Sequence, residues 1–307
     1  MGVQVILLER YSYLGGLWTG GLVLPILSTH GLSPQKEWTK VVWGFSHEIH
    51  ERLKAMDMVV NDLAPHVDPE ACKYVLEQFC EEAGVRIIYH SWASDLLMSG
   101  DRIDAIFLET KSGPIAVKGK NFVDASGDGD LIAWSGEDFI EINHHIGAMY
   151  RIGGVSEDMD KVGEGIYLLE TPQQTGVRVT RILQSVGNVT YEGSMTYKTY
   201  DDAIGMGGGS ASLMYQGRKI KASERPYWQI PYTSILPKKC HNLLVAGRCF
   251  GFKEELAYDA REISTCLVTG QAAGIASAQA VMNRTSVQDV DVRALRKNLL
   301  AQNARLE

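Results

Sequence analysis

The sequence is short of basic charge and of long apolar runs, and each shortage excludes a class of protein. Acidic residues outnumber lysine and arginine by 37 to 30, which gives a formal net charge of −7. A nucleic-acid-binding protein needs a basic face. No apolar run approaches the roughly 20 residues that span a bilayer, and the N-terminus lacks the pattern of an export signal. We therefore expect a cytoplasmic protein that binds neither nucleic acid nor a membrane.

Cysteine pairs are also missing. The 5 cysteines are scattered and form no Cys-x-x-Cys motif, which favours free thiols in a reducing compartment. His144 and His145 are neighbours on an expected strand and point to opposite faces, so they do not share a metal ion. We expect no metal site. The sequence leaves open whether the chain forms a homo-oligomer.

What is abundant is glycine, with 31 residues in a chain of 307, or about 10% against an average of ~7%. Apolar residues make up 45% and charged residues 22%, so the chain has an ordinary globular composition with ample core. Clustered glycines suit a fold that lays its backbone against a ligand.

Hydrophobic periodicity and turn signals predict an α/β protein. We expect helices over 37–56, 68–84 and 259–282 and from 291 onward, parallel strands at 3–8, 85–89, 120–124 and 242–246, and an antiparallel meander over 94–118. Short β-like stretches fill 137–234. The predicted organisation is a Rossmann-like parallel domain, made of 1–136 and 235–307, into which a β-rich substrate or cap region, 137–234, is inserted.

Three segments point to one nucleotide ligand. The first is a buried strand that ends at Glu9 and is followed by Gly15-Gly16. This is how the second strand of a dinucleotide-binding βαβ unit ends, with its acid placed to bind a ribose hydroxyl. The unit's first strand and its Gly-x-Gly-x-x-Gly turn are not found before Glu9. An acid at a strand end is alone a weak signal, and a purely structural role is about as well supported.

The other two segments also follow predicted strands. One is the small-residue turn Asp124-Ala-Ser-Gly-Asp-Gly-Asp130, which lets the backbone approach a phosphate or a ring closely. The other is the strand that ends in Gly247-Arg248, followed by a helix that begins near Asp259. The N-terminus of a helix carries partial positive charge and stabilises an anionic group.

Taken together, the chain resembles the FAD-dependent oxidoreductase family, with a glutathione-reductase-like FAD-binding fold. The matching stretches run through nearly the whole chain in the family's order: ERYSYLGG (9–16), DPEACKYVLEQFCEEAGVRIIYHS (68–91), VDASGDGDL (123–131), TGVRVTRI (175–182), IPYTSILP (230–237), NLLVAGRCF (242–250) and AREISTCLVTGQAAGIASA (260–278). The resemblance implies an FAD cofactor and a small-molecule substrate that exchanges a hydride with the flavin.

The resemblance also implies roles for particular residues. Glu9, with Arg10 beside it, would bind the adenosine ribose, and Gly15 and Gly16 would lie along the pyrophosphate or ribityl chain. Ala93 would offer its backbone to adenine. The remaining residues are expected beside the ribityl chain and the flavin: Ala125, Ser126, Gly127, Gly247, Arg248, Arg261, Gln271 and Ala272. Arg261 would face the flavin or the substrate, or would instead pair with Glu254 or Glu255.

Several alternatives stay open. The absent first strand indicates a fragment or late-start form of a longer enzyme, a unit completed by another chain, or lost FAD binding; we favour the first and expect poor stability of this chain alone. The second interpretation of function is a non-catalytic remnant or subunit, and a third, less favoured one is a NAD-only dehydrogenase. Arg178 and Arg181 would bind a substrate carboxylate or form structural salt bridges, and His30 would be an acid or base near the flavin or merely exposed.

Overall fold

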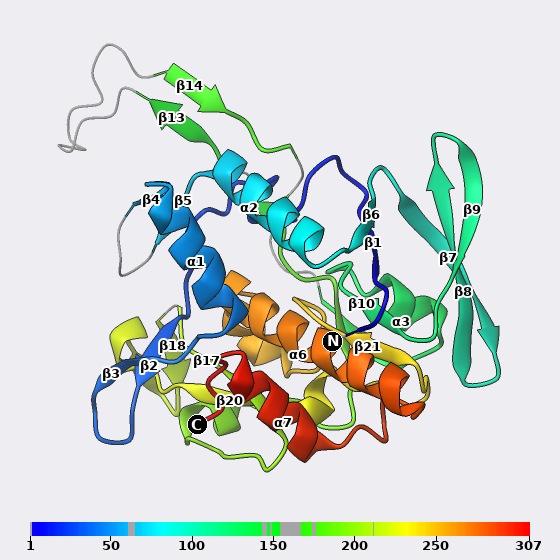
Figure 1. Ribbon diagram of the computed structural model, residues 1–307. Coiled ribbons are helices and arrows are strands. Elements are labelled where there is room, and N and C mark those ends of the chain that lie inside the picture. Colours follow the sequence, from blue (N-terminus) through cyan, green and yellow to red (C-terminus); the bar gives the residue numbers. More distant parts are fainter. Residues whose placement is uncertain are drawn as a thin grey trace.

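The computed structural model describes residues 2–60, 65–142, 146–147, 149–153, 167–173, 176–210 and 212–307. Its helices are α1 (Phe45–Ala55), α2 (Pro69–Glu82), α3 (Asp130–Trp134), α4 (Tyr191–Met195), α5 (Ala257–Ala260), α6 (Ile263–Asn283) and α7 (Val292–Ala301). Short 3₁₀ segments are η1 (Ala222–Glu224), η2 (Tyr232–Ile235) and η3 (Glu254–Leu256). The fold is a mixed α/β arrangement, with α6 crossing the middle of the molecule (Figure 1).

The strands are short and form many small sheets. In the first half they are β1 (Ile6–Leu8), β2 (His30–Leu32), β3 (Trp38–Lys40), β4 (Val59–Val60), β5 (His66–Val67), β6 (Arg86–Ile88), β7 (Trp92–Ser99), β8 (Arg102–Thr110), β9 (Gly113–Lys118), β10 (Phe122–Asp124), β11 (Phe139–Glu141), β12 (Ile146–Gly147) and β13 (Arg151–Gly153). The rest are β14 (Tyr167–Glu170), β15 (Gly176–Val177), β16 (Arg181–Leu183), β17 (Ala203–Gly207), β18 (Leu213–Tyr215), β19 (Arg218–Ile220), β20 (Trp228–Pro231) and β21 (Leu243–Val245).

The parallel part of the fold consists of two separate strand pairs. β1 pairs with β6, Leu7 opposite Ile87, and β10 pairs with β21, Val123 opposite Leu244. No ladder joins the two pairs within the described part of the chain. Val5 and Ile6 are 46% and 42% exposed, although parallel strands are normally buried on both faces. The predicted parallel sheet is therefore small and interrupted.

The antiparallel meander predicted over 94–118 lies at that position as the three-stranded sheet β7-β8-β9. It stands to one side of the two parallel pairs (Figure 1). Its inner face carries Leu96, Ile103, Ile106 and Leu108, which pack with Phe122 and other residues in a core of their own. The meander is thus anchored to β10 by apolar contacts.

The helix α2 follows its sequence signals. The Asp68 side chain accepts the backbone N–H groups of Glu70 and Ala71, Pro69 takes the first helical position, and the chain turns at Gly84 with φ +65°. These are the standard start and stop signals of a helix.

The prediction of a helix over 37–56 is wrong in its first half, because Trp38–Lys40 pairs with β2 as strand β3, and α1 begins only after Gly44.

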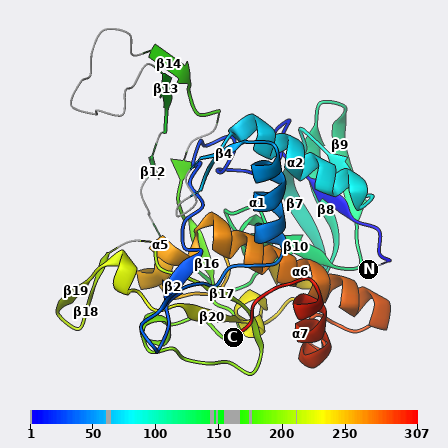
Figure 2. The same cartoon turned by 60° about the vertical axis from the view of Figure 1, so that its left-hand side comes forward.

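The region predicted as a substrate or cap region, residues 137–234, is called the central region below. It contains short antiparallel pairs: β11 with β16, β12 with β15, β13 with β14, β17 with β20 and β18 with β19. The β13–β14 hairpin projects from the body of the molecule (Figure 2). The strands β17 and β20 instead lie in the largest buried cluster, with residues of α6 and α7. Members of all three predicted parts of the chain share this cluster, so the described residues of β17 and β20 pack in a core common to these parts.

Asn242 joins the meander to the β10–β21 pair. It is 1% exposed; its side-chain oxygen accepts the N–H of Ile103, and its amide donates to the carbonyls of Ile103 and Lys120 at 2.9 and 3.1 Å. The side chain therefore satisfies three backbone groups that have little access to water. Its position fixes β21 relative to β8.

We predict that Asn242→Ala lowers the free energy of unfolding by about 3 kcal/mol, because it leaves buried backbone groups without partners. Urea denaturation followed by circular dichroism measures the effect. The matched control is Asn283→Ala at the exposed end of α6, which we expect to change stability by less than about 0.5 kcal/mol. Equal effects of the two substitutions would contradict this role of Asn242.

Candidate functional site

The first predicted segment begins where β1 ends. Glu9 continues the pairing of β1, because its N–H donates to the Ile88 carbonyl at 3.0 Å. Its carboxylate accepts the N–H of Tyr11 at 2.9 Å. Burial raises the pKa of Glu9, and the bond from Tyr11 opposes that rise. The carboxylate is thus fixed at the carboxyl end of a parallel strand, with lone pairs left for a second donor.

Arg10 and its neighbours form an aromatic and cationic surface beside Glu9. The Arg10 guanidinium lies 4.8 Å from the ring centre of Tyr11 and 5.1 Å from that of Trp92. Trp92 is 57% exposed and opens β7. The predicted Ala93 follows it in β7 and pairs with Leu108. Arg10 therefore stacks on two rings beside Glu9, and one of them belongs to the residue that precedes Ala93.

Gly15 and Gly16 begin a compact turn. The N–H of Trp18 donates to the Gly15 carbonyl at 3.0 Å, and the N–H of Gly20 donates to that of Gly16 at 2.9 Å. Thr19 closes the turn by donating its hydroxyl to the Leu14 carbonyl at 2.6 Å. A Cβ at Gly16 would meet nothing within 4 Å. The backbone at Gly16 is therefore accessible to a ligand.

The second predicted segment is organised by Asp124 at the end of β10. Asp124 is 1% exposed, and its carboxylate accepts the Ser126 N–H and hydroxyl and the Ile132 N–H. Burial raises the pKa of Asp124, and these hydrogen bonds oppose that rise. The Ser126 oxygen accepts the N–H of Gly129 at 3.0 Å. Asp124 thus folds the turn and orients Ala125, Ser126 and Gly127 after the strand.

The third predicted segment contacts the second directly. Arg248 follows β21, and its guanidinium donates to the Asp128 carboxylate at 3.0 Å and to the Arg178 carbonyl at 3.3 Å. A Cβ at Gly127 would lie 2.6 Å from Arg248 Nε. Gly127 has φ +76° and Gly247 φ +79°, a backbone region that favours glycine. The structure thus brings Gly127, Gly247 and Arg248 together.

Two predicted residues of α6 lie apart from that contact. Ala272 is fully buried in the main core. The Gln271 side chain accepts the Phe45 N–H at 3.2 Å and donates to Gln302 at 3.2 Å, so it binds the start of α1 and the end of α7. The link from α6 to the Arg248 loop is instead Thr269, whose hydroxyl oxygen accepts the Gly247 N–H at 3.0 Å.

Of the two arginines at 178 and 181, the structure gives Arg181 the salt-bridge role. It donates to the Asp128 carbonyl at 2.9 Å and forms an ion pair with Asp130 at 3.2 Å. His30 lies in β2, where its Nδ1 is 2.9 Å from the Thr29 hydroxyl and its ring stacks on Trp38. Burial and the charge of Lys40 lower the pKa of His30. The pair His144-His145 lies outside the described residues.

Asp128 is a residue of this region that was not among those expected to bind the cofactor. Its carboxylate holds Arg248 and the Thr180 hydroxyl, and its carbonyl holds Arg181. The only signal in the sequence is the Gly-Asp-Gly-Asp run, where alternating glycines expose the acids between them. Its partners are more than 50 positions away along the chain, so spacing could not reveal them.

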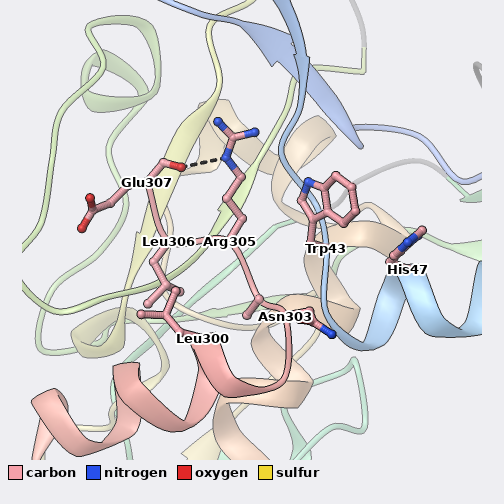
Figure 3. Close-up of a pocket in the computed structure, with 8 residues that line it drawn as sticks. Trp43, His47, Leu300, Asn303, Arg305, Leu306 and Glu307 are labelled. Atoms are coloured by element: carbon pink, nitrogen blue, oxygen red, sulfur yellow. Dashed lines mark hydrogen bonds between the residues drawn. The ribbon is translucent and has the colours of Figure 1, made fainter.

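An open pocket of about 680 Å³ lies elsewhere, between α1 and the chain after α7. Trp43 and His47 line one side, and Leu300, Asn303 and Arg305 line the other (Figure 3). None of the residues predicted to bind the cofactor lines it. The loops after β1, β10 and β21 are the better candidate site, because they carry the acid, the small residues and the guanidinium that a dinucleotide needs.

We predict that Gly127→Ala destabilises the protein more than Gly247→Ala does. Both add a Cβ at positive φ and should cost about 1 kcal/mol each. Only the Cβ at position 127 meets Arg248, since nothing lies within 4 Å at position 247. Displacing Arg248 from Asp128 should cost about 1 kcal/mol more. Thermal denaturation measures both, and the difference should vanish in an Arg248→Ala background. A difference that survives there would contradict the contact.

A comparison with protein families finds a match over most of the chain. A profile of the family described as FAD dependent oxidoreductase matches residues 1–165 and 147–299. A search of curated protein sequences finds no match. Among the described residues, no helix is long and apolar enough to span a membrane, and no group of three or more metal-binding side chains is found.

Solved structures of two hydroxylases show distant likeness. CabE, an aromatic hydroxylase from angucycline biosynthesis, is 12% identical, with a TM-score of 0.46 over 98% of this chain and 64% of its own. OxyS anhydrotetracycline hydroxylase from Streptomyces rimosus is 11% identical, with a TM-score of 0.48 over 98% of this chain and 60% of its own. The chain thus spans less than two thirds of either enzyme, and neither likeness is close enough to transfer a substrate. The matching profile covers most of the sequence: the chain belongs to the FAD-dependent oxidoreductase family, whose cofactor is FAD.

Proposed function

We propose that the chain binds FAD across the carboxyl ends of β1, β10 and β21 and transfers a hydride between the flavin and a small-molecule substrate. The observation that supports this most is the contact of Arg248 with Gly127 and Asp128. It joins two loops that follow adjacent parallel strands, and in open α/β sheets ligands bind at the carboxyl ends of the strands.

The residues of the three loops fit different parts of FAD. Glu9 would accept hydrogen bonds from the adenosine ribose, because its carboxylate accepts the Tyr11 N–H and keeps lone pairs for a further donor. Gly16 and Gly247 leave open space where a side chain would stand, so the backbone can approach the cofactor. The Arg248 guanidinium is held by the Asp128 carboxylate at 3.0 Å and offers its remaining N–H donors on the side of β21. The resemblance assigns that side to the ribityl chain and the flavin.

FAD would supply the two-electron chemistry. The protein would bind and orient the substrate and exclude water from the site. Donors and charges that are already fixed near the cofactor stabilise the charge that develops in the reaction, because the site does not have to reorganise. The substrate itself is not identified by any pair of acid and base in the three loops. We therefore propose the reaction class, hydride transfer, and leave the substrate's carbon skeleton open to screening.

We predict that Glu9→Gln weakens FAD binding about 10-fold, because an amide replaces the carboxylate that accepts ribose hydroxyls. Equilibrium titration followed by flavin fluorescence measures the affinity. Glu81→Gln, at an exposed position of α2, is the matched control and should bind FAD as the unchanged protein does. An unchanged affinity of Glu9→Gln would contradict the assignment of Glu9.

A second candidate function, a subunit that needs another strand to complete its nucleotide-binding sheet, is favoured by one observation. β1 and β10 each have a ladder on one side only among the described residues, and Leu8 of β1 packs against the cluster that holds Phe122 of β10 and Leu243 of β21. An unpaired strand edge accepts a further strand. The same titration separates the candidates: a folded protein that binds no FAD at all would support the second.

A further inference from the structure

A cluster of charged side chains lies beside the Arg248 loop, where the central region meets the start of α6. Two side chains of the cluster neutralise each other's charge. Arg225 and Asp259 form a fully buried ion pair, at 1% and 2% exposure. Asp259 also accepts the N–H and the hydroxyl of Ser210. Asp259 is therefore committed to these partners, and it is not a counter-ion for other cations in the cluster.

Arg261 is not neutralised in that way. It sits at the break between α5 and α6, and its guanidinium lies 5.7 Å from the ring centre of Tyr258. Its Nε is buried and has no hydrogen-bond partner among the described residues. Burial lowers the pKa of Arg261, the charge of Glu262 opposes that change, and the charge of Arg178 adds to it. A buried donor without a partner is costly and requires an explanation, such as a ligand.

Arg178 belongs to the central region, between β15 and β16, and it is close enough to Arg261 for its charge to act on that guanidinium. Its Nη2 would lie 2.9 Å from a Cβ at Gly147, so the guanidinium passes close over β12. Its carbonyl accepts the Arg248 guanidinium at 3.3 Å, which ties it to the candidate FAD site. In the described part of the chain, no carboxylate forms an ion pair with Arg178, whereas Arg181 has Asp130.

The nearest acid does not balance the two cations. Glu262 is 7% exposed, and it accepts the Ser210 hydroxyl at 3.3 Å. Burial raises its pKa, although the charges of Arg261 and Arg178 oppose that rise. Within the residues that the structure describes, it has no ion pair with either arginine. The cluster therefore carries two guanidinium charges against one buried carboxyl group.

We propose that Arg178 and Arg261 together bind a carboxylate group of the substrate. Guanidinium groups present planar forks of N–H donors that match a carboxylate, often in two parallel hydrogen bonds. The two residues come from the central region and from the α5–α6 break, so the substrate would be held between these parts.

The substrate, and not the cofactor, is the source of the anion that we infer. A phosphate of FAD has similar chemistry, and a guanidinium would bind it too. Glu9, which fits the adenosine ribose, follows the other strand pair, whereas Arg178 contacts Arg248 on the side of β21. This choice rests on the proposed function, in which the β21 side holds the flavin. The substrate class that results is a carboxylic acid.

The test titrates the FAD-loaded protein with benzoate and with succinate, and with benzamide as the neutral counterpart of benzoate. Binding is followed by calorimetry and by the visible spectrum of the flavin. We expect at least one carboxylate to bind, and benzamide to bind at least about 10-fold more weakly than benzoate. Arg178→Gln and Arg261→Gln should each weaken carboxylate binding about 10-fold.

Two variants serve as controls. Arg218→Gln removes an arginine of β19 that is 73% exposed, and it should bind carboxylates as the unchanged protein does. Arg261→Lys keeps the charge and loses the fork, so it should recover part of the affinity. Circular dichroism and thermal denaturation establish that each variant is folded, and a variant that fails to fold is replaced by its lysine counterpart at the same position.

Three outcomes would overturn the proposal: no carboxylate binds, carboxylates bind the two glutamine variants unchanged, or Arg218→Gln causes the same loss. Repeating the calorimetry on flavin-free protein separates this proposal from the proposed function. If FAD does not bind, the proposed function fails while the two arginines are still tested. If both glutamine variants lose FAD affinity but keep their carboxylate affinity, the arginines bind the cofactor and the substrate proposal is wrong.

Discussion

The ion pair between Arg248 and Asp128 is the contact on which the geometry of the candidate site depends. Their 3.0 Å bond joins the loops after β21 and β10. Both side chains are mostly buried, at 14% and 26% exposure, so water screens the pair less than an exposed one. The glycine at position 127 lets the guanidinium pass against the backbone. The parallel ladder joins β10 and β21 themselves, and this ion pair joins the loops that follow them.

The same acid connects the site to the central region. Asp128 also holds Thr180 and, through its carbonyl, Arg181 next to β16. Arg178 lies on this stretch, and its carbonyl returns a bond to Arg248. Hydrogen bonds thus join the β10 loop to the central region, the central region to the β21 loop, and the β21 loop to the β10 loop. It places the residues proposed for the substrate next to those proposed for the cofactor.

Local signals in the sequence account for much of the fold. Asp68, Pro69 and Gly84 define α2 because a capping carboxylate, a fixed φ and a left-handed stop act within a few residues of one another. The strand β3 was predicted as helix, because the apolar spacing of 37–56 does not reveal that Trp38–Lys40 pairs with β2. Tertiary pairing overrides local periodicity there.

The residues of the candidate site could be predicted from local signals, whereas the contacts between them could not. Each loop shows its small residues and its acid in the sequence, so Glu9, Gly127 and Arg248 could be chosen as candidates. Their contacts depend on chain segments that are far apart, as with Asp128 and Arg248. Gln271 shows the limit: its position in a motif predicted a cofactor contact, whereas its side chain binds Phe45 and Gln302. A residue's place in a helix does not fix which neighbour its side chain meets.

The most direct test of the account is backbone hydrogen–deuterium exchange, measured with and without FAD. The account predicts that FAD slows exchange at 9–16, 124–129 and 246–249 together, because one ligand covers all three loops. The β18–β19 hairpin should show no change, since it carries none of the proposed cofactor contacts. Slower exchange only around the pocket of Trp43 and Arg305, or at none of the three loops, would contradict the account.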